Sequence, residues 1–73
     1  MITAQKLQYL TTLPHQLLAA ALPKKDRVTL AAAEFIGITN GGQFCYSARD
    51  VEDQVFKLFV SYDPAADRVS VDM

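Results

Sequence analysis

The segment from Gln54 to Met73, QVFKLFVSYDPAADRVSVDM, constrains the fold more than any other part of the chain. Apolar side chains alternate with other residues along it, at Phe56, Leu58, Val60 and Tyr62 and again at Val69, Val71 and Met73. Alternation at every second residue is the period of a β-strand with one buried face. Between the two runs, Asp63 followed by Pro64 is typical of a type I turn. The segment therefore predicts an antiparallel hairpin with one face turned to the core.

The expected register of this hairpin follows from a loop formed by residues 63–66. That loop pairs Val60 with Val69, which places two apolar residues opposite each other. It also places Lys57 opposite Asp72, a cross-strand pair of opposite charge.

Residues 34–48, EFIGITNGGQFCYSA, have two interpretations, a helix-turn-helix or a second β-hairpin. In the first, the recognition helix would open with Asn40-Gly41-Gly42, and each glycine costs about 1 kcal/mol in a helix interior. That helix would also lack Lys and Arg before Arg49, so it would make few phosphate contacts. In a hairpin, the same Asn-Gly-Gly supplies positive φ without steric strain. We favour the hairpin, which pairs Ile38 with Phe44.

The strand pairing that continues from this turn determines which face of the sheet each side chain occupies. It sets Ile36 opposite Tyr46 on the core face, and it turns Phe35 to the other face, where Gly37 lies opposite Cys45. Upstream, residues 28–35 (VTLAAAEF) stay open between strand and helix. Three alanines favour helix, and Glu34 in a strand would point inward.

The first third of the chain carries helical signals. Thr3 is a typical N-cap, and leucines then recur along one side at Leu7, Leu10 and Leu13. Pro14 would break a helix interior but suits the first turn of a new helix, with Thr12 or Leu13 as its cap. Pro23 ends the second helix. Two short helices, or one helix bent at Pro14, are therefore predicted.

These elements combine into an α+β fold in a single small domain, residues 1–73. We expect two short N-terminal helices packed on one face of a small antiparallel β-meander of three to four strands. The strands are expected at about 28–39, 43–48, 54–62 and 68–72. A chain of 73 residues with one cysteine is small and has no intramolecular disulfide to stabilise it. We therefore expect a homodimer.

The residues that bear catalytic or metal-binding groups form no recognisable site in the sequence. His15 and Cys45 lack the orienting partner that nucleophilic catalysis needs. Asp50, Glu52 and Asp53 are expected in a solvated turn, because a calcium loop spreads its ligands over about 12 residues around a glycine. Glycine-rich phosphate loops and paired-cysteine patterns are absent from the sequence. We expect no enzymatic activity, no cofactor and no metal.

The charge and hydropathy of the chain limit the kinds of partner that it is expected to bind. The net charge of −1 gives no overall attraction for nucleic acid or anionic lipid. The apolar runs are shorter than the roughly 18–20 residues that span a bilayer, so we expect no membrane association. A lone cysteine and no apolar leader segment indicate the cytoplasm. The length and the initial Met1 are typical of small accessory proteins of bacteria or phages.

Four residues are expected to lie on the sheet face away from the core: Phe35, Cys45, Val55 and Phe59. An uncovered apolar patch on a small protein marks a contact with another protein. The leading hypothesis is a non-enzymatic protein-binding regulator, adaptor or inhibitor that acts through this exposed sheet face. The sequence does not name its partner.

The alternative hypothesis is a small DNA-binding transcriptional regulator. It would use the N-terminal helices and the basic segment formed by Lys24, Lys25 and Arg27. We do not favour nucleic-acid binding, because the candidate recognition segment lacks base-reading side chains and cations.

Overall fold

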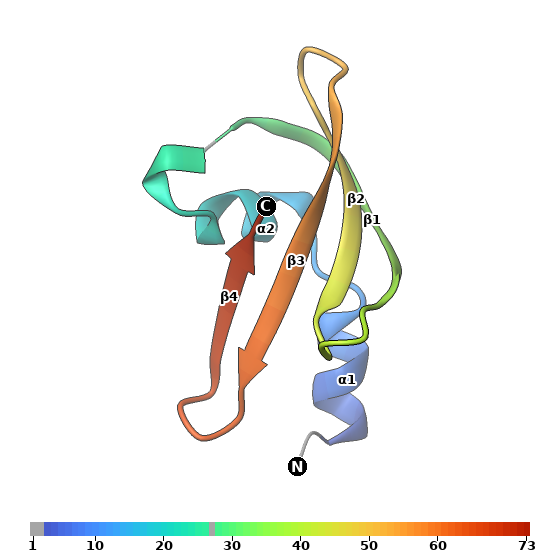
Figure 1. Cartoon of the computed structure of the whole chain (residues 1–73), viewed down its shortest axis with the longest axis vertical. Helices are drawn as coiled ribbons and strands as arrows, with labels where there is room; N and C mark the ends of the chain where they lie inside the picture. The colour runs from blue at the N-terminus through green and yellow to red at the C-terminus, as the bar shows by residue number, and fades with distance from the viewer. Residues whose placement is uncertain (1–2, 27) are drawn as a thin grey trace.

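The computed structural model describes residues 3–26 and 28–73. Its elements are α1 (Ala4–Leu10), α2 (His15–Ala21), the 3-10 helix η1 (Lys24–Asp26), β1 (Leu30–Ile38), β2 (Phe44–Asp50), β3 (Val55–Asp63) and β4 (Arg68–Asp72). The strands form one antiparallel sheet in the order β1-β2-β3-β4. Helix α2 packs against β1 and β4, and in Figure 1 both helices lie behind the strands. The predicted α+β meander is confirmed.

The helix caps agree with the sequence at α1 and differ at α2. The Lys6 backbone N–H donates to Thr3 Oγ1 at 3.1 Å, so Thr3 is the predicted N-cap. The cap of α2 is Pro14, and the expectation of Thr12 or Leu13 there was wrong. Thr12 Oγ1 instead donates to the Gln8 carbonyl oxygen at 2.7 Å, which closes the end of α1.

Tyr46 joins the helices to the sheet at the centre of the core. Its hydroxyl accepts a hydrogen bond from the Leu13 N–H at 3.0 Å and donates to the Leu10 carbonyl oxygen at 2.5 Å. Desolvation raises the pKa of this hydroxyl, against the lowering effect of the Leu13 N–H. The other fully buried large side chains are Leu10, Leu18, Leu58 and Val60. The link between α1 and α2 is therefore held by the same core that holds the strands.

The turn between β1 and β2 is the predicted hairpin, so the helix-turn-helix interpretation was wrong. The Thr39 N–H donates to the Gln43 carbonyl oxygen at 2.8 Å, and the Gly42 N–H donates to the Thr39 carbonyl oxygen at 3.0 Å. Gly42 has a φ of +82°, the positive value for which a glycine is needed. Ile38 lies opposite Phe44, as expected.

Strand β1 resolves the open question about residues 28–35, because it begins at Leu30 and is not helical. Its register shifts between Phe35 and Gly37, so that Phe35 and not Ile36 lies opposite Tyr46. The predicted positions of Phe35 and Ile36 were therefore wrong. The shift turns Glu34 to solvent and packs the Phe35 ring at 5.6 Å from the Tyr46 ring. Removing a carboxylate from the core and adding an aromatic ring favours this bulge.

The hairpin of β3 and β4 forms, but its register differs from the expected one by two residues. Val60 lies opposite Val71, and Phe59 rather than Lys57 lies opposite Asp72. The loop is residues 64–67, where Asp67 has a φ of 49° and its Oδ1 accepts a hydrogen bond from the Tyr62 hydroxyl at 2.6 Å. A shift of two leaves every side chain on its predicted face, because strand alternation has a period of two.

Candidate functional site

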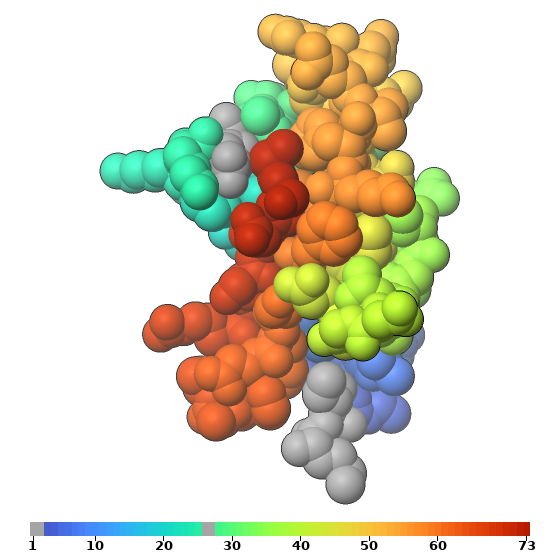
Figure 2. Space-filling view, viewed as in Figure 1, coloured from blue at the N-terminus to red at the C-terminus, as the bar shows by residue number. Residues whose placement is uncertain are grey.

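The sheet face opposite the helices, which we call the outer face, is the candidate site. Figure 2 shows the molecule from the side on which the strands lie in front of the helices. Strand pairing arranges residues of β1, β2 and β3 on this face in three rows: Ala32–Arg49–Val55, Glu34–Ser47–Lys57 and Gly37–Cys45–Phe59. Ser70 and Asp72 of β4 extend it, opposite Ser61 and Phe59 of β3.

Three of the four predicted contact residues lie together on the outer face. Val55 is 70% exposed, Phe59 is half-buried, and Cys45 is buried with 8% of its surface exposed. Cys45 lies between Gly37 and Phe59 in its row. The fourth residue, Phe35, lies on the core face and packs against the core cluster, because of the bulge in β1.

A shallow hollow lies on the outer face between β1 and β3. Its volume is about 280 Å³, and its lining includes Ala32, Glu34, Ser47, Arg49 and Val55. The short side chains of Ala32 and Ser47 leave this space open, and the longer ones of Glu34 and Arg49 bound it. The hollow is large enough to accept a partner's aliphatic side chain.

Two residues of β1 on the outer face were missed in the sequence. Gly37 was expected opposite Cys45 and lies there, whereas Ala32 and Glu34 were not predicted on this face, because their face depends on the bulge between Phe35 and Gly37. Glu34 was the available signal. A strand without a bulge would have directed its carboxylate into the core, at a large desolvation penalty.

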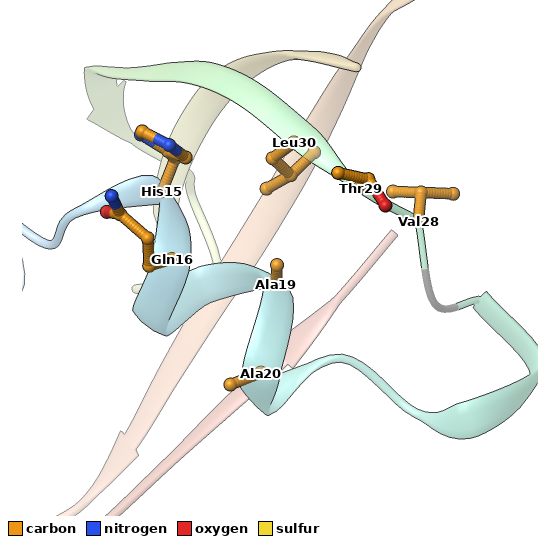
Figure 3. Close-up of a pocket in the computed structure, with 7 residues that line it drawn as sticks. All are labelled: His15, Gln16, Ala19, Ala20, Val28, Thr29 and Leu30. Atoms are coloured by element: carbon orange, nitrogen blue, oxygen red, sulfur yellow. The ribbon is translucent and has the colours of Figure 1, made fainter. Parts of the chain in front are cut away.

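A groove lies on the helix side, between α2 and the segment that leads into β1 (Figure 3). It measures about 410 Å³ and is lined by His15, Gln16, Ala19, Ala20, Val28, Thr29 and Leu30. Figure 3 shows His15 and Gln16 at the start of α2, across from Val28, Thr29 and Leu30. Its walls are mostly apolar, with an imidazole, an amide and a hydroxyl at the rim. His15 and Cys45 belong to opposite layers of the fold and do not form a catalytic pair.

The acidic run after β2 organises a turn. Asp50 Oδ1 accepts hydrogen bonds from the backbone N–H groups of Glu52 and Gln54, both at 2.9 Å. Asp53 has a φ of 66°, and Arg49 Nη1 lies 3.8 Å from its Oδ1. Across residues 3–26 and 28–73, no group of three His, Cys, Asp or Glu side chains is placed to hold a metal ion.

A small polar network connects α1 to the β3–β4 turn. Lys6 Nζ lies 3.1 Å from Asp67 Oδ1, the oxygen that also accepts from Tyr62. The Tyr62 and Lys6 hydrogen bonds lower the pKa of Asp67. The bond to Asp67 raises the pKa of both Lys6 and Tyr62. Lys6 is thus engaged within the molecule.

The basic segment of the alternative hypothesis is described only in part. Lys24 and Lys25 are exposed on η1. Arg27 lies outside the described residues. The structure therefore leaves nucleic-acid contact through this segment a prediction.

No protein-family model, curated protein or solved structure matches this chain. In the described part of the chain, no helix has the length and apolar character needed to cross a membrane. The candidate site rests on the geometry of the outer face.

Proposed function

We propose that this chain is a small non-enzymatic protein-binding module, a regulator, adaptor or inhibitor that acts through the outer face. The observation that carries the proposal is the exposure of Val55 on a sheet face without a helix over it, a face that also carries half-buried Phe59. Apolar side chains on an uncovered face gain free energy when a partner removes them from water.

The shape of the outer face favours a protein over a small molecule. Its hollow of about 280 Å³ is open and shallow. Sites for small molecules are usually concave and measure about 300–1,000 Å³. The charged row Glu34–Ser47–Lys57 lies between the rows that hold Phe59 and Val55, so an extended protein surface can meet charged and apolar groups at once.

The lone cysteine supports a cytoplasmic location for the proposed accessory protein of a bacterium or phage. Cys45 is a free, buried thiol, which suits a reducing compartment. DNA binding receives no comparable support, because residues 34–48 form a hairpin and not a recognition helix.

Two matched valines test the proposal. Val55 is 70% exposed on the outer face, and Val51 is 64% exposed in the β2–β3 turn. Val55→Asp introduces a charge that a contact would desolvate, whereas Val51→Asp introduces the same charge away from the outer face. Both variants are expected to fold, which circular dichroism checks.

The measurement combines affinity capture from an extract of the source cells with sedimentation of the purified protein. A protein retained by the wild type and by Val51→Asp, but lost with Val55→Asp, is the expected result; a second copy of the chain counts as that protein. Equal retention by all three chains, or a wild type that retains nothing and does not self-associate, contradicts the proposal.

A further inference from the structure

We propose that a second copy of this chain occupies the outer face, with the two sheets packed face to face about a two-fold axis along β2. This inference rests on the proposed function, because it names the partner of the same face. It specifies which strands meet: β1 of each copy lies over β3 of the other, and β2 lies over β2.

Symmetry sets the contacts within each row. A two-fold axis that lies between the sheets and runs along β2 exchanges β1 with β3 without changing the position along the strands. Each residue at the β1 end of a row then faces the residue at the β3 end of the same row in the other copy. Such an interface must be complementary to itself.

The central row meets this requirement through charge. It carries Glu34 on β1, Ser47 on β2 and Lys57 on β3. In the dimer each Glu34 faces a Lys57, and the two short serines meet at the axis. Neither charged side chain belongs to an ion pair within residues 3–26 and 28–73. A second copy supplies the missing partner to both at once.

The two flanking rows meet the requirement through size. In one, Phe59 of each copy faces Gly37, which has no side chain. In the other, Val55 faces Ala32, a residue that lines the hollow of about 280 Å³. A large apolar side chain therefore meets a small residue in each flanking row, as packing across an interface demands.

The charges of Glu34 and Lys57 also favour this two-fold axis over one perpendicular to the strands. An axis perpendicular to the strands through Ser47 would set Glu34 against Glu34 and Lys57 against Lys57, which is unfavourable. Among the charged residues of the three rows, the axis along β2 brings only Arg49 close to its own copy. That guanidinium lies beside Asp53, with Nη1 at 3.8 Å from Oδ1, which offsets the repulsion.

The size of the face predicts a weak dimer. Three strands about 4.8 Å apart and about seven residues long cover roughly 300 Å² in projection. Stable complexes bury about 800 Å² of accessible surface per partner, so association is expected only at micromolar or higher concentrations. Packed sheets also cross at about 30°, which makes the central row the best matched.

Charge exchange across the central row tests the inference, measured by sedimentation equilibrium from micromolar to millimolar concentration. Glu34→Lys and Lys57→Glu, each alone, place like charges together twice per dimer and should raise the Kd roughly tenfold or more. The double variant restores both pairs and should return the Kd to within about threefold of the wild type. Glu52→Lys in the β2–β3 turn makes the same charge change off the outer face and should have no effect.

Three results would overturn the proposed dimer. A wild type that stays monomeric at millimolar concentration, or single variants that do not weaken the dimer, overturns the inference. A double variant that fails to recover overturns it as well. If either single variant unfolds, Glu34→Gln and Lys57→Gln take its place, and each should weaken association while retaining the fold. A monomeric wild type that still captures another protein through Val55 would exclude the second copy and leave the proposed function standing.

Discussion

The two faces of the sheet differ in how far the chain itself buries their side chains, and neighbouring residues of β3 show the difference. Leu58 on the core face has no exposed surface, because side chains of the same chain enclose it. Phe59 on the outer face is half-buried beside Cys45 and Asp72. On the core face, apolar side chains pack against one another, and the hydroxyl of Tyr46 is hydrogen-bonded to Leu13 and Leu10 of the same chain. On the outer face, Glu34 and Lys57 lie on different strands on either side of Ser47, and in the proposed dimer a second copy supplies the opposite charge to each.

The largest effect that tests this contrast is expected from charges placed on the two faces in turn. Leu58→Asp buries a carboxylate and should unfold the chain, because the penalty matches the roughly 3–5 kcal/mol of stability that a core this small provides. Phe59→Lys sets its charge opposite Asp72 and should leave the far-UV circular dichroism spectrum unchanged. Unfolding by Phe59→Lys would place that residue in the core and remove the distinction between the faces.

A smaller effect is expected from the polar group that the core face does contain. Tyr46→Phe leaves the Leu13 N–H and the Leu10 carbonyl oxygen without their buried partner, which should lower the free energy of unfolding by about 1–3 kcal/mol. Ser47→Ala, one residue along and on the outer face, should change it by less than about 0.5 kcal/mol. Urea denaturation of both variants measures the difference. Equal losses would show that the two faces contribute alike.

The smallest effect is expected at the border of the sheet, in the Lys6–Asp67–Tyr62 network. Because the pKa of Asp67 is lowered in the folded state, its contribution is present above the ordinary value of 3.8 and is lost as the pH falls through the lowered one. The raised pKa of Lys6 gives a contribution that disappears only as the pH rises through a value above 10.5. Asp67→Asn should therefore reduce the fall in Tm between neutral pH and pH 2, and so should Lys6→Met. A pH profile identical to that of the wild type would show that the network adds nothing.

The sequence predicted the faces of β3 and β4 better than their pairing. Alternation assigned Leu58 and Val60 to the core, and that assignment survives a register error of two residues. The pairing itself depended on the loop, where Tyr62 and Asp67 form a hydrogen bond that residue spacing does not reveal. Local pattern therefore fixes which way a side chain points, whereas tertiary contacts choose its neighbour.

On β1 the outer face was predicted correctly only at Gly37, because the bulge moves the residues before it by one position. A one-residue shift exchanges the two faces, which placed Phe35 in the core and Glu34 outside. The prediction of Cys45, Val55 and Phe59 required only regular strands. Regular pairing from the turn also placed Gly37 correctly, because the bulge lies beyond it. Ala32 and Glu34 required knowing where the regular pairing stops, and that depends on how Phe35 packs against Phe44 and Tyr46.

The irregular register of β1 also has a consequence for solubility. This nine-residue strand is an edge of the sheet, carries Glu34 as its single charge, and exposes Ile36 and Ile38. A long, straight edge of that composition is a template for the strands of other molecules and hence for fibrous aggregation. Register shifts on both sides of residues 32–35 leave only that short stretch regular. The same bulge that sorts the side chains of β1 thus protects the chain against open-ended, strand-by-strand polymerisation.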